Sequence, residues 1–308
     1  MAIWHIKVAT PSKAREQRES SKCRHTVLRL SPMLMASSAM TGCKEGILDP
    51  RGPIGVQEKL LLYDATVIML SVVIPVIALT IGFAWWFRDG NHRARYRPDW
   101  EYSGQIELIV WTIPALIVFF LGGIAWISSH ELDPPRPIAS REAPLDVDVV
   151  SLDWRWLFIY PAAGIASLNE LVIPSGTAVR FHLTAASVMN SFFIPQLGSQ
   201  IYTMPDMVTN LNLLAKDTGV FAGLSAQFSG EGFSDMRFTV RVVRTDEFTR
   251  WVGGLRREST TLDEATLLEL AHPQIAGPPV RYARVEPALF DHISSGHLTS
   301  QLSRVQER

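Results

Sequence analysis

The chain has 308 residues, a formal net charge of −1 and a hydrophobic content of 47%. This length is sufficient for a membrane-embedded part together with one folded domain. The near-neutral charge argues against nucleic acid as a partner, because nucleic-acid binding requires a basic face. Both cysteines, Cys23 and Cys43, precede the first long apolar run. The large C-terminal part contains no cysteine, so it cannot hold a disulfide, a thiolate metal site or a cysteine nucleophile.

Residues 1–42 are typical of a secretory signal peptide. Arg24 and Arg29 precede a short apolar patch, and two small residues stand directly before Cys43. A basic start, an apolar core and small residues before the cleavage point are the marks of such a leader. The cysteine favours the lipoprotein type, in which Cys43 is the lipid attachment site and the mature N-terminus. The alternative is a disordered tail with a chance cysteine.

Two long apolar runs predict two transmembrane helices. The first covers Leu60 to Phe87 and the second covers Ile106 to Ile127. Each reaches the roughly 20 apolar residues that are needed to cross a bilayer. We therefore expect a transmembrane helix hairpin over residues 59–128, after a periplasmic N-terminal segment at 43–58.

The loop between the two runs is rich in arginine and indicates the orientation. It holds Arg88, Arg93, Arg95 and Arg97. By the positive-inside rule this loop is cytoplasmic. Cys43 and everything after about Ser128 then face the periplasm, which agrees with lipid addition on the outer face. We expect a multi-pass protein of the bacterial inner (plasma) membrane.

A single carboxylate stands near the start of the second run. Glu107 lies one residue into the apolar stretch, at its cytoplasmic end. Position alone favours a boundary carboxylate that reaches for water. The functional alternative is a proton-entry group, since intramembrane carboxylates often mark proton paths.

The remainder of the chain predicts an exported β domain. A Pro-rich linker over 129–144 is followed by about nine short segments, many of which alternate apolar and polar residues between turn-forming residues. This pattern predicts a Greek-key β-sandwich over 145–245. Residues 246–308 form a helical and irregular extension, which we expect to be polar and loosely packed from about Pro273.

Few residues of the exported domain suggest chemistry. His182 lies in a strand pattern and is interpreted as structural, with no second histidine nearby. Trp154 and Trp156 are predicted to share one strand and one face, as a core or interface pair. The domain has no Ser-His-Asp spacing and no Gly-rich phosphate loop. The residues by themselves indicate a lipid-anchored subunit of a larger membrane complex, not an enzyme acting alone.

The arrangement resembles subunit II of the haem-copper respiratory oxidases, in which a helix hairpin precedes a periplasmic cupredoxin domain. Three motifs carry the resemblance: DWRW at Asp153 to Trp156, EXXXWTIP at Glu107 to Pro114, and GVFAGLSAQFSG from Gly219. It covers roughly Gly46 to Val243. The implied fold is an α hairpin followed by an all-β, cupredoxin-like Greek-key sandwich with a helical C-terminal extension.

The copper-bearing members of this family hold a binuclear centre through one histidine and the motif C-S-E-x-C-G-x-x-H-x-x-M. The matching positions here are Asn190, Ser225, Gln227, Ser229, Phe233 and Met236. Among these six positions, Met236 alone keeps the residue of the motif. Serine hydroxyls cannot replace bridging thiolates for copper. The resemblance therefore implies that the copper site is lost and that this chain holds no metal or other cofactor.

The chain also resembles subunit II of the cytochrome bo-type ubiquinol oxidases. This resemblance rests on the same loss of the copper site and on three stretches: VMNSFFIPQLGSQIY, FSGEGFSDM and the ILDPRGPIG that follows shortly after Cys43. Such an enzyme oxidises membrane quinol in subunit I, which carries the haems and one copper, and reduces oxygen to water while pumping protons. The resemblance implies subunits I, III and IV as partners. It gives Glu107 the proton-entry role, and leaves Trp154 and Trp156 a packing role in a chain without a catalytic centre.

Two other functions remain as alternatives. A cytochrome c oxidase subunit with a remodelled copper site is opposed by the absence of cysteine from the domain. A lipoprotein scaffold or assembly factor with a cupredoxin-like domain is opposed by Glu107 and the hairpin motifs, which would have no purpose in a scaffold.

Overall fold

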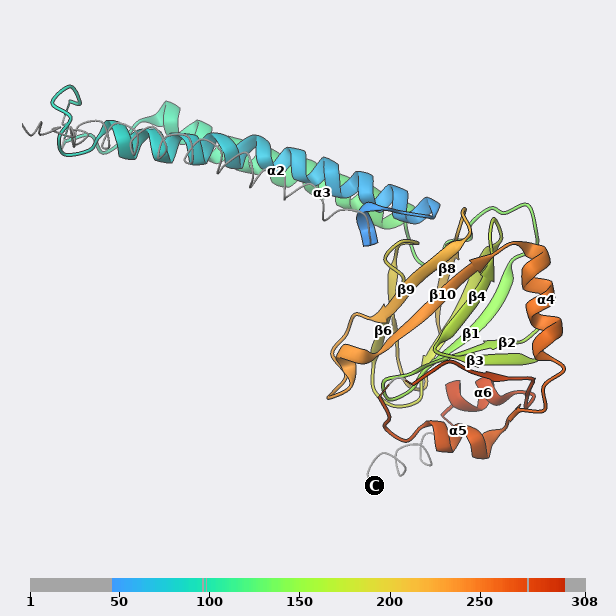
Figure 1. Ribbon diagram of the computed structural model, residues 1–308. Coiled ribbons are helices and arrows are strands. Elements are labelled where there is room, and N and C mark those ends of the chain that lie inside the picture. Colours follow the sequence, from blue (N-terminus) through green and yellow to red (C-terminus); the bar gives the residue numbers. More distant parts are fainter. Residues whose placement is uncertain (1–45, 96, 98, 276, 297–308) are drawn as a thin grey trace, which may run out of the picture. The chain divides into compact units, whose positions relative to one another are not determined.

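The computed structural model describes residues 46–95, 97, 99–275 and 277–296 (Figure 1). The predicted signal peptide and the predicted lipid attachment site at Cys43 lie outside these residues. The chain divides into two compact units, 1–49 and 50–308. Within the first unit, the described residues contain one turn of 3₁₀ helix, η1 (Gly46–Leu48).

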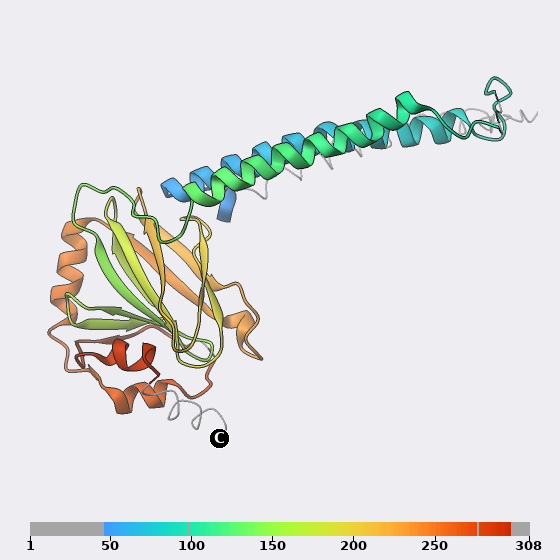
Figure 2. The same ribbon diagram turned by 180° about the vertical axis from the view of Figure 1, so that it is seen from behind.

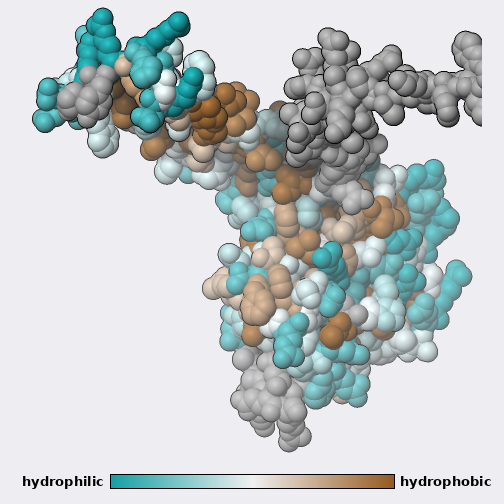
Figure 3. Space-filling model, turned by 60° about the vertical axis from the view of Figure 1, so that its left-hand side comes forward, coloured by the Kyte–Doolittle hydropathy of each residue, from teal (hydrophilic) through white to brown (hydrophobic). Residues whose placement is uncertain are grey.

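The second unit begins with the two predicted membrane-length helices, α2 (Pro53–Trp86) and α3 (Gly104–Glu131). Both are long and apolar enough to cross a membrane. Brown, hydrophobic side chains gather along the hairpin in Figure 3, and hydrophilic ones gather at its loop end. The helices are longer than the predicted hairpin of 59–128. Helix α2 starts earlier because Pro53 suits a first helical turn, where its missing N–H is not needed.

A β-sandwich follows the hairpin, as predicted (Figures 1 and 2). Its ten main strands are β1 (Leu145–Ser151), β2 (Trp156–Tyr160), β3 (Ile165–Leu168), β4 (Glu170–Pro174), β5 (Ala178–Ala185), β6 (Asn190–Phe193), β7 (Gln200–Thr203), β8 (Thr209–Leu214), β9 (Gly219–Ser225) and β10 (Arg237–Val243). One sheet has the order β12-β3-β2-β1-β5-β8, in which β12 (Val280–Tyr282) comes from the C-terminal extension, and the other has the order β4-β10-β9-β6-β7. Strands β1 and β5 pair in parallel, as do β4 and β10.

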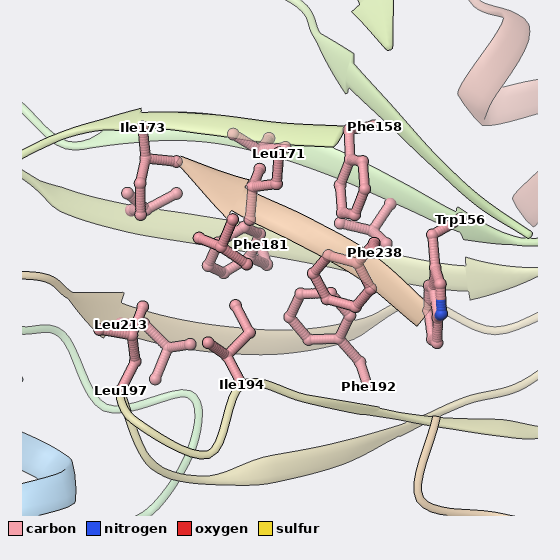
Figure 4. Close-up of a cluster of buried hydrophobic side chains, with 14 of the residues drawn as sticks. Trp156, Phe158, Leu171, Ile173, Phe181, Phe192, Ile194, Leu197, Leu213 and Phe238 are labelled. Carbon is pink, nitrogen blue, oxygen red and sulfur yellow. The ribbon is translucent and has the colours of Figure 1, made fainter. Parts of the chain in front are cut away.

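The main core lies between the two sheets and is rich in aromatic rings. Trp156, Phe158, Phe192 and Phe238 face one another there (Figure 4). The rings of Phe192 and Phe238 stack at 5.2 Å between centroids, with an angle of 11° between their planes. Because alternate residues of a strand point to opposite faces, Trp156 and Phe158 of β2 point into this core while Leu157 points out of it.

The C-terminal extension packs in two places. Its first helix, which contains Phe248, Trp251 and the buried Leu255, packs against the main core, and the later elements cover the outer face of the first sheet. The elements of the extension are α4 (Thr245–Leu255), β11 (Thr261–Leu262), α5 (Glu264–Leu270), β12 (Val280–Tyr282), β13 (Arg284–Val285) and α6 (Leu289–Ser294). A second hydrophobic cluster joins Leu157 and Ile159 of β2 to Leu289 and Ile293 of α6. All four of these side chains are buried.

The expectation of loose packing from Pro273 is therefore wrong for the described residues from Val280 onward, whereas residues 273–275 and 277–279 are exposed and belong to no helix or strand. Strand β12 pairs with β3 and extends the first sheet. Leu289 and Ile293 stand one helical turn apart and bury a shared face in the second cluster. A short apolar pair in a polar stretch was too weak a signal to predict this packing.

Candidate functional site

The positions of the family's copper motif meet at one end of the second sheet. Asn190 starts β6 and Ser225 ends β9, and these strands pair antiparallel with Phe192 opposite Ser225. The loop after β9 contains Gln227 and Ser229 and leads through a short 3₁₀ helix, η2 (Phe233–Asp235), to Met236 before β10. Strand pairing therefore places Asn190 beside a loop that lies far away in the sequence. We call this set of six positions, Asn190, Ser225, Gln227, Ser229, Phe233 and Met236, the motif loop site.

Two of the six side chains are hydrogen-bonded to each other in the sandwich interior. The Ser225 hydroxyl donates to Asn190 Oδ1 at 3.1 Å. It also accepts from the Ser191 backbone N–H at 3.4 Å. Asn190 is fully buried and Ser225 is 4% exposed. Burial makes these contacts matter, because an unpaired polar group in the interior is expensive.

The remaining positions offer few donors that suit a soft metal. The Met236 sulfur is fully buried and lies 4.0 Å from Ser229 Oγ. The Phe233 ring packs against Phe228 with centroids 5.7 Å apart. The backbone carbonyl of Gln227 lies 3.3 Å from Ser225 Oγ and is a second acceptor for the one hydroxyl proton that Asn190 Oδ1 also accepts. Among the residues that the structure describes, no group of three or more His, Cys, Asp or Glu side chains is placed to hold a metal ion.

Trp154 connects this loop to the first sheet, but not in the way that was predicted. It lies before β2 and has a left-handed backbone with φ 65°. Leu152 N–H donates to Arg155 O at 2.9 Å, so Asp153 and Trp154 form a two-residue hairpin tip. The prediction that Trp154 and Trp156 share one strand is therefore wrong. A tight turn replaces the start of the strand.

The Trp154 indole packs onto glycines of the motif loop. Its Nε1–H donates to Ser229 O at 3.1 Å. A Cβ atom at Gly232 would collide with the indole ring, and one at Gly230 would lie 3.2 Å from it. Glycine is required there because it allows close approach. Trp156, in contrast, is fully buried in the aromatic core.

Glu107 lies in the first turn of α3. The partial positive charge at a helix N-terminus favours a carboxylate at this position. Its side chain is exposed and makes no hydrogen bond or ion pair with another of the described residues. The Glu107 carboxylate is therefore accessible at the loop end of the hairpin. Glu107 is not part of the motif loop site, whose residues belong to the sandwich.

Hydrogen bonds that the sequence did not predict connect the hairpin to the sandwich. The backbone N–H of Gly55, in the first turn of α2, donates to Leu197 O at 3.0 Å. The Glu58 carboxylate accepts from the Ser199 backbone N–H at 2.7 Å and from its hydroxyl at 3.2 Å. These bonds join the start of α2 to the β6–β7 loop.

Three glycines make this contact possible, and we call Gly52, Gly55 and Gly198 the glycine latch. A Cβ at Gly52 would collide with Leu214 O, and one at Gly198 would lie 2.6 Å from Gly55 N. Gly198 also has φ 98°, which disfavours other residues. The glycines of PRGPIG and QLGS were visible in the sequence, but their partnership depends on the tertiary fold.

Two buried carboxylates of the sandwich are paired. Asp148 on β1 lies 3.0 Å from His182 Nδ1 on β5, which fits the expected structural role for this histidine. Burial raises the pKa of Asp148 above its ordinary value of 3.8, and the hydrogen bond from His182 opposes that shift. Glu170 on β4 is held by Arg241 of β10 and Arg281 of β12.

Comparisons with known proteins place the chain. The family described as cytochrome c oxidase subunit II, periplasmic domain, matches residues 154–243, and the one described as COX aromatic rich motif matches 256–295. The solved periplasmic domain of subunit II of the cytochrome oxidase of Bradyrhizobium japonicum is 26% identical over 38% of this chain and 96% of that one, with a TM-score of 0.35.

Two curated relatives are more similar. Cytochrome bo(3) ubiquinol oxidase subunit 2 of Pseudomonas aeruginosa is 47% identical over 86% of this chain and 79% of its own length. Ubiquinol oxidase subunit 2 of Acetobacter aceti is 47% identical over 84% of this chain and 85% of its own length. The chain therefore belongs to the family of ubiquinol oxidase subunit 2.

Proposed function

We propose that this chain is subunit II of a proton-pumping quinol oxidase, which oxidises ubiquinol and reduces oxygen to water. In this proposal the chain itself holds no redox centre. It stabilises subunit I and contributes to proton entry. Membership of the ubiquinol oxidase subunit 2 family supports the enzyme class.

The proposal that this chain holds no copper centre rests on the side chains present at the motif loop site. A binuclear copper centre needs thiolate and imidazole donors. The corresponding positions hold an amide, two hydroxyls and a phenyl ring. Asn190 and Ser225 are hydrogen-bonded to each other, so their oxygens are already engaged. One buried thioether, Met236, is a weak substitute for a complete soft-ligand set, and these residues do not fit the metal.

The redox groups would accordingly lie in subunit I, as haems together with one copper. Electrons would pass from quinol into that subunit without crossing the exported domain. Trp154 and Trp156 would then serve packing, which agrees with the contact of Trp154 with the motif loop and with the burial of Trp156 in the core. Subunits III and IV would complete the complex.

Glu107 would supply protons from the cytoplasm. Its carboxylate is exposed in the first turn of α3, at the loop end of the hairpin. The arginine-rich loop supports the cytoplasmic placement of this end. In this topology the hairpin spans the bacterial inner membrane and the sandwich lies in the periplasm. A lipid on Cys43 anchors the mature N-terminus in the outer leaflet of that membrane.

The test is made on the purified complex. Oxidation of quinol and of reduced cytochrome c is measured side by side, and copper is counted against haem. We expect quinol oxidation with a single copper for each pair of haems. Turnover of cytochrome c together with additional copper would overturn the argument from the donor set. A preparation without haem would instead support a scaffold.

The role of Glu107 has its own test. Glu107→Gln removes the titratable group, and we expect slower quinol turnover and reduced proton pumping with unchanged subunit composition. Glu101→Gln is the matched control, because Glu101 is an exposed carboxylate just before the same helix. Equal effects of the two variants would reject a specific role for Glu107.

A further inference from the structure

Two adjoining cavities lie where α2 and α3 approach the sandwich. The first, which we call the tail groove, has a volume of about 540 Å³ and an almost entirely apolar lining that includes Leu61, Leu62, Ala65, Leu121, Ile124 and Ala125. The second, the head cavity, has a volume of about 190 Å³, and its polar lining includes Gln57, Glu131, Asp133, Arg136, Ser199 and Asn212. Leu132 lines both cavities. One site thus joins an apolar part to a charged part.

The two cavities follow the same faces of the helices. Gln57, Leu61 and Ala65 are spaced by one helical turn each on α2, so they form a single row that passes from the head cavity into the tail groove. On α3 the groove runs from Leu121 to Leu132, which is roughly 17 Å of helix. That length is close to half of the ~30 Å hydrocarbon thickness of a bilayer, the depth of one leaflet.

The head cavity carries charges of both signs that are not used inside the chain. Among the described residues, no ion pair involves Glu131, Asp133 or Arg136. Arg136 donates to the backbone carbonyl of Glu131 at 3.2 Å, which fixes the guanidinium at the end of α3. The two carboxylates and the rest of the guanidinium are therefore available to a ligand.

The backbone around the head cavity is held in place. Asn212 of β8 donates its backbone N–H to Pro134 O and its side-chain Nδ2 to Pro135 O, each at 2.9 Å. These bonds fix the linker between Asp133 and Arg136 against the sandwich. The charged groups are thus presented by a rigid segment, which lowers the ordering cost of binding.

We propose that the tail groove and the head cavity bind one zwitterionic phospholipid of the phosphatidylethanolamine class. Its ammonium group pairs with Glu131 and Asp133, and its phosphate pairs with Arg136. One acyl chain fills the tail groove, and Ser128 and Ser129 at the polar end of the groove face the glycerol ester region. The proposal rests on the membrane placement given under the proposed function, which puts this lipid in the periplasmic leaflet.

The charges of the head cavity favour a zwitterionic lipid over a helix of a partner subunit as the occupant. A helix would cover the tail groove, but the groove continues into a cavity with acidic and basic groups side by side. A zwitterionic headgroup matches that pair of charges and is joined to an apolar chain of matching length. An anionic phospholipid matches the arginine but is repelled by the two carboxylates.

The first test fills the tail groove. The intact oxidase complex is delipidated, incubated with vesicles of phosphatidylethanolamine or phosphatidylglycerol, and weighed by native mass spectrometry to count retained lipids. We expect the unmodified complex to retain one phosphatidylethanolamine more than the Ala125→Phe variant. Ala78→Phe, on α2 outside the groove, is the control and is expected to keep that lipid. An unchanged lipid count in Ala125→Phe would overturn the proposal.

The second test reads the headgroup. The double variant Glu131→Gln with Asp133→Asn is expected to lose the preference for phosphatidylethanolamine, by about tenfold, because charge-assisted hydrogen bonds are removed. Arg136→Gln is expected to weaken binding of both lipids. Equal binding of the two lipids by the unmodified complex would contradict the assignment.

Subunit composition distinguishes a failure of the lipid proposal from a failure of the proposed function. Loss of subunit I from Ala125→Phe with an unchanged lipid count would assign the groove to a partner helix and reject the lipid. A failed proposed function would appear as absent quinol turnover or absent haem in the unmodified complex, independently of any lipid count.

Discussion

Glu170 provides a sharp test of how the C-terminal extension is held. Its carboxylate is 6% exposed and lies 3.0 Å from Arg241 Nη1 of β10. Its other oxygen accepts from Nε and Nη2 of Arg281 at 2.9 and 2.7 Å. Because Arg281 belongs to β12, this one side chain fastens the extension to the sandwich. The change Glu170→Gln keeps the shape and removes the charge.

The magnitude follows from the exposure of the partners. Breaking a fully buried ion pair destabilises by about 3–5 kcal/mol. Here the side chains of Arg241 and Arg281 are 40% and 38% exposed, so water compensates part of the loss. We expect a decrease of about 2 kcal/mol in the free energy of unfolding, which lowers the Tm of a domain of this size by about 4–8 °C.

The measurement is thermal unfolding of the purified chain in detergent, followed by tryptophan fluorescence. Asp146→Asn is the matched control. Asp146 makes an equally short bidentate contact with Arg180, but its side chain is 36% exposed and that of Arg180 is 50% exposed. We expect about 0.5 kcal/mol for this surface pair. A control that destabilises as much as Glu170→Gln would refute the argument from burial.

Three further changes, the first of them with a control variant, test other contacts. Gly198→Ala is expected to destabilise by more than 2 kcal/mol, because it combines a backbone with φ 98° and a Cβ atom 2.6 Å from an α2 nitrogen. Gly164→Ala, with φ 65° and open space around its Cβ, should show the roughly 1 kcal/mol of backbone strain alone, and equal effects would reject the glycine latch. Asp148→Asn is tested across pH. Because the pKa of Asp148 is raised, the native state binds this proton more tightly than the unfolded state does. The stability of the unmodified chain therefore falls as the pH rises from 3.8 through the raised pKa, and the variant is expected to lack this decrease. Gly232→Ala should displace the Trp154 indole and shift its fluorescence emission, and an unchanged spectrum would contradict the packing described here.

The parts of the fold that could be predicted have local signatures. The apolar runs around Ile74 and Val118 are long enough to exclude most alternatives to membrane-length helices. The strand segments of the sandwich were visible because many of them alternate and are bounded by turn residues. The positions of the copper motif could be located because their spacing survives even where the residue types have changed.

The parts that could not be predicted depend on tertiary contacts. The tip at Asp153 and Trp154 lacks the glycine that usually marks a two-residue hairpin turn, so a strand was predicted there. The glycine latch joins segments that lie more than a hundred residues apart. The six-residue helix α6 is too short to show a helical period and is positioned by the sheet that it covers.

The extension has a practical consequence for any attempt to isolate the sandwich. A chain ended at Val243 would keep every strand of the second sheet but lose β12, leaving β3 as an unpaired edge. It would also bare Leu157, Ile159 and their neighbours on the outer face of the first sheet. Open strand edges beside apolar surface promote self-association. A soluble fragment should therefore run to at least Ser295, and the C-terminal segment acts as a built-in cover against aggregation.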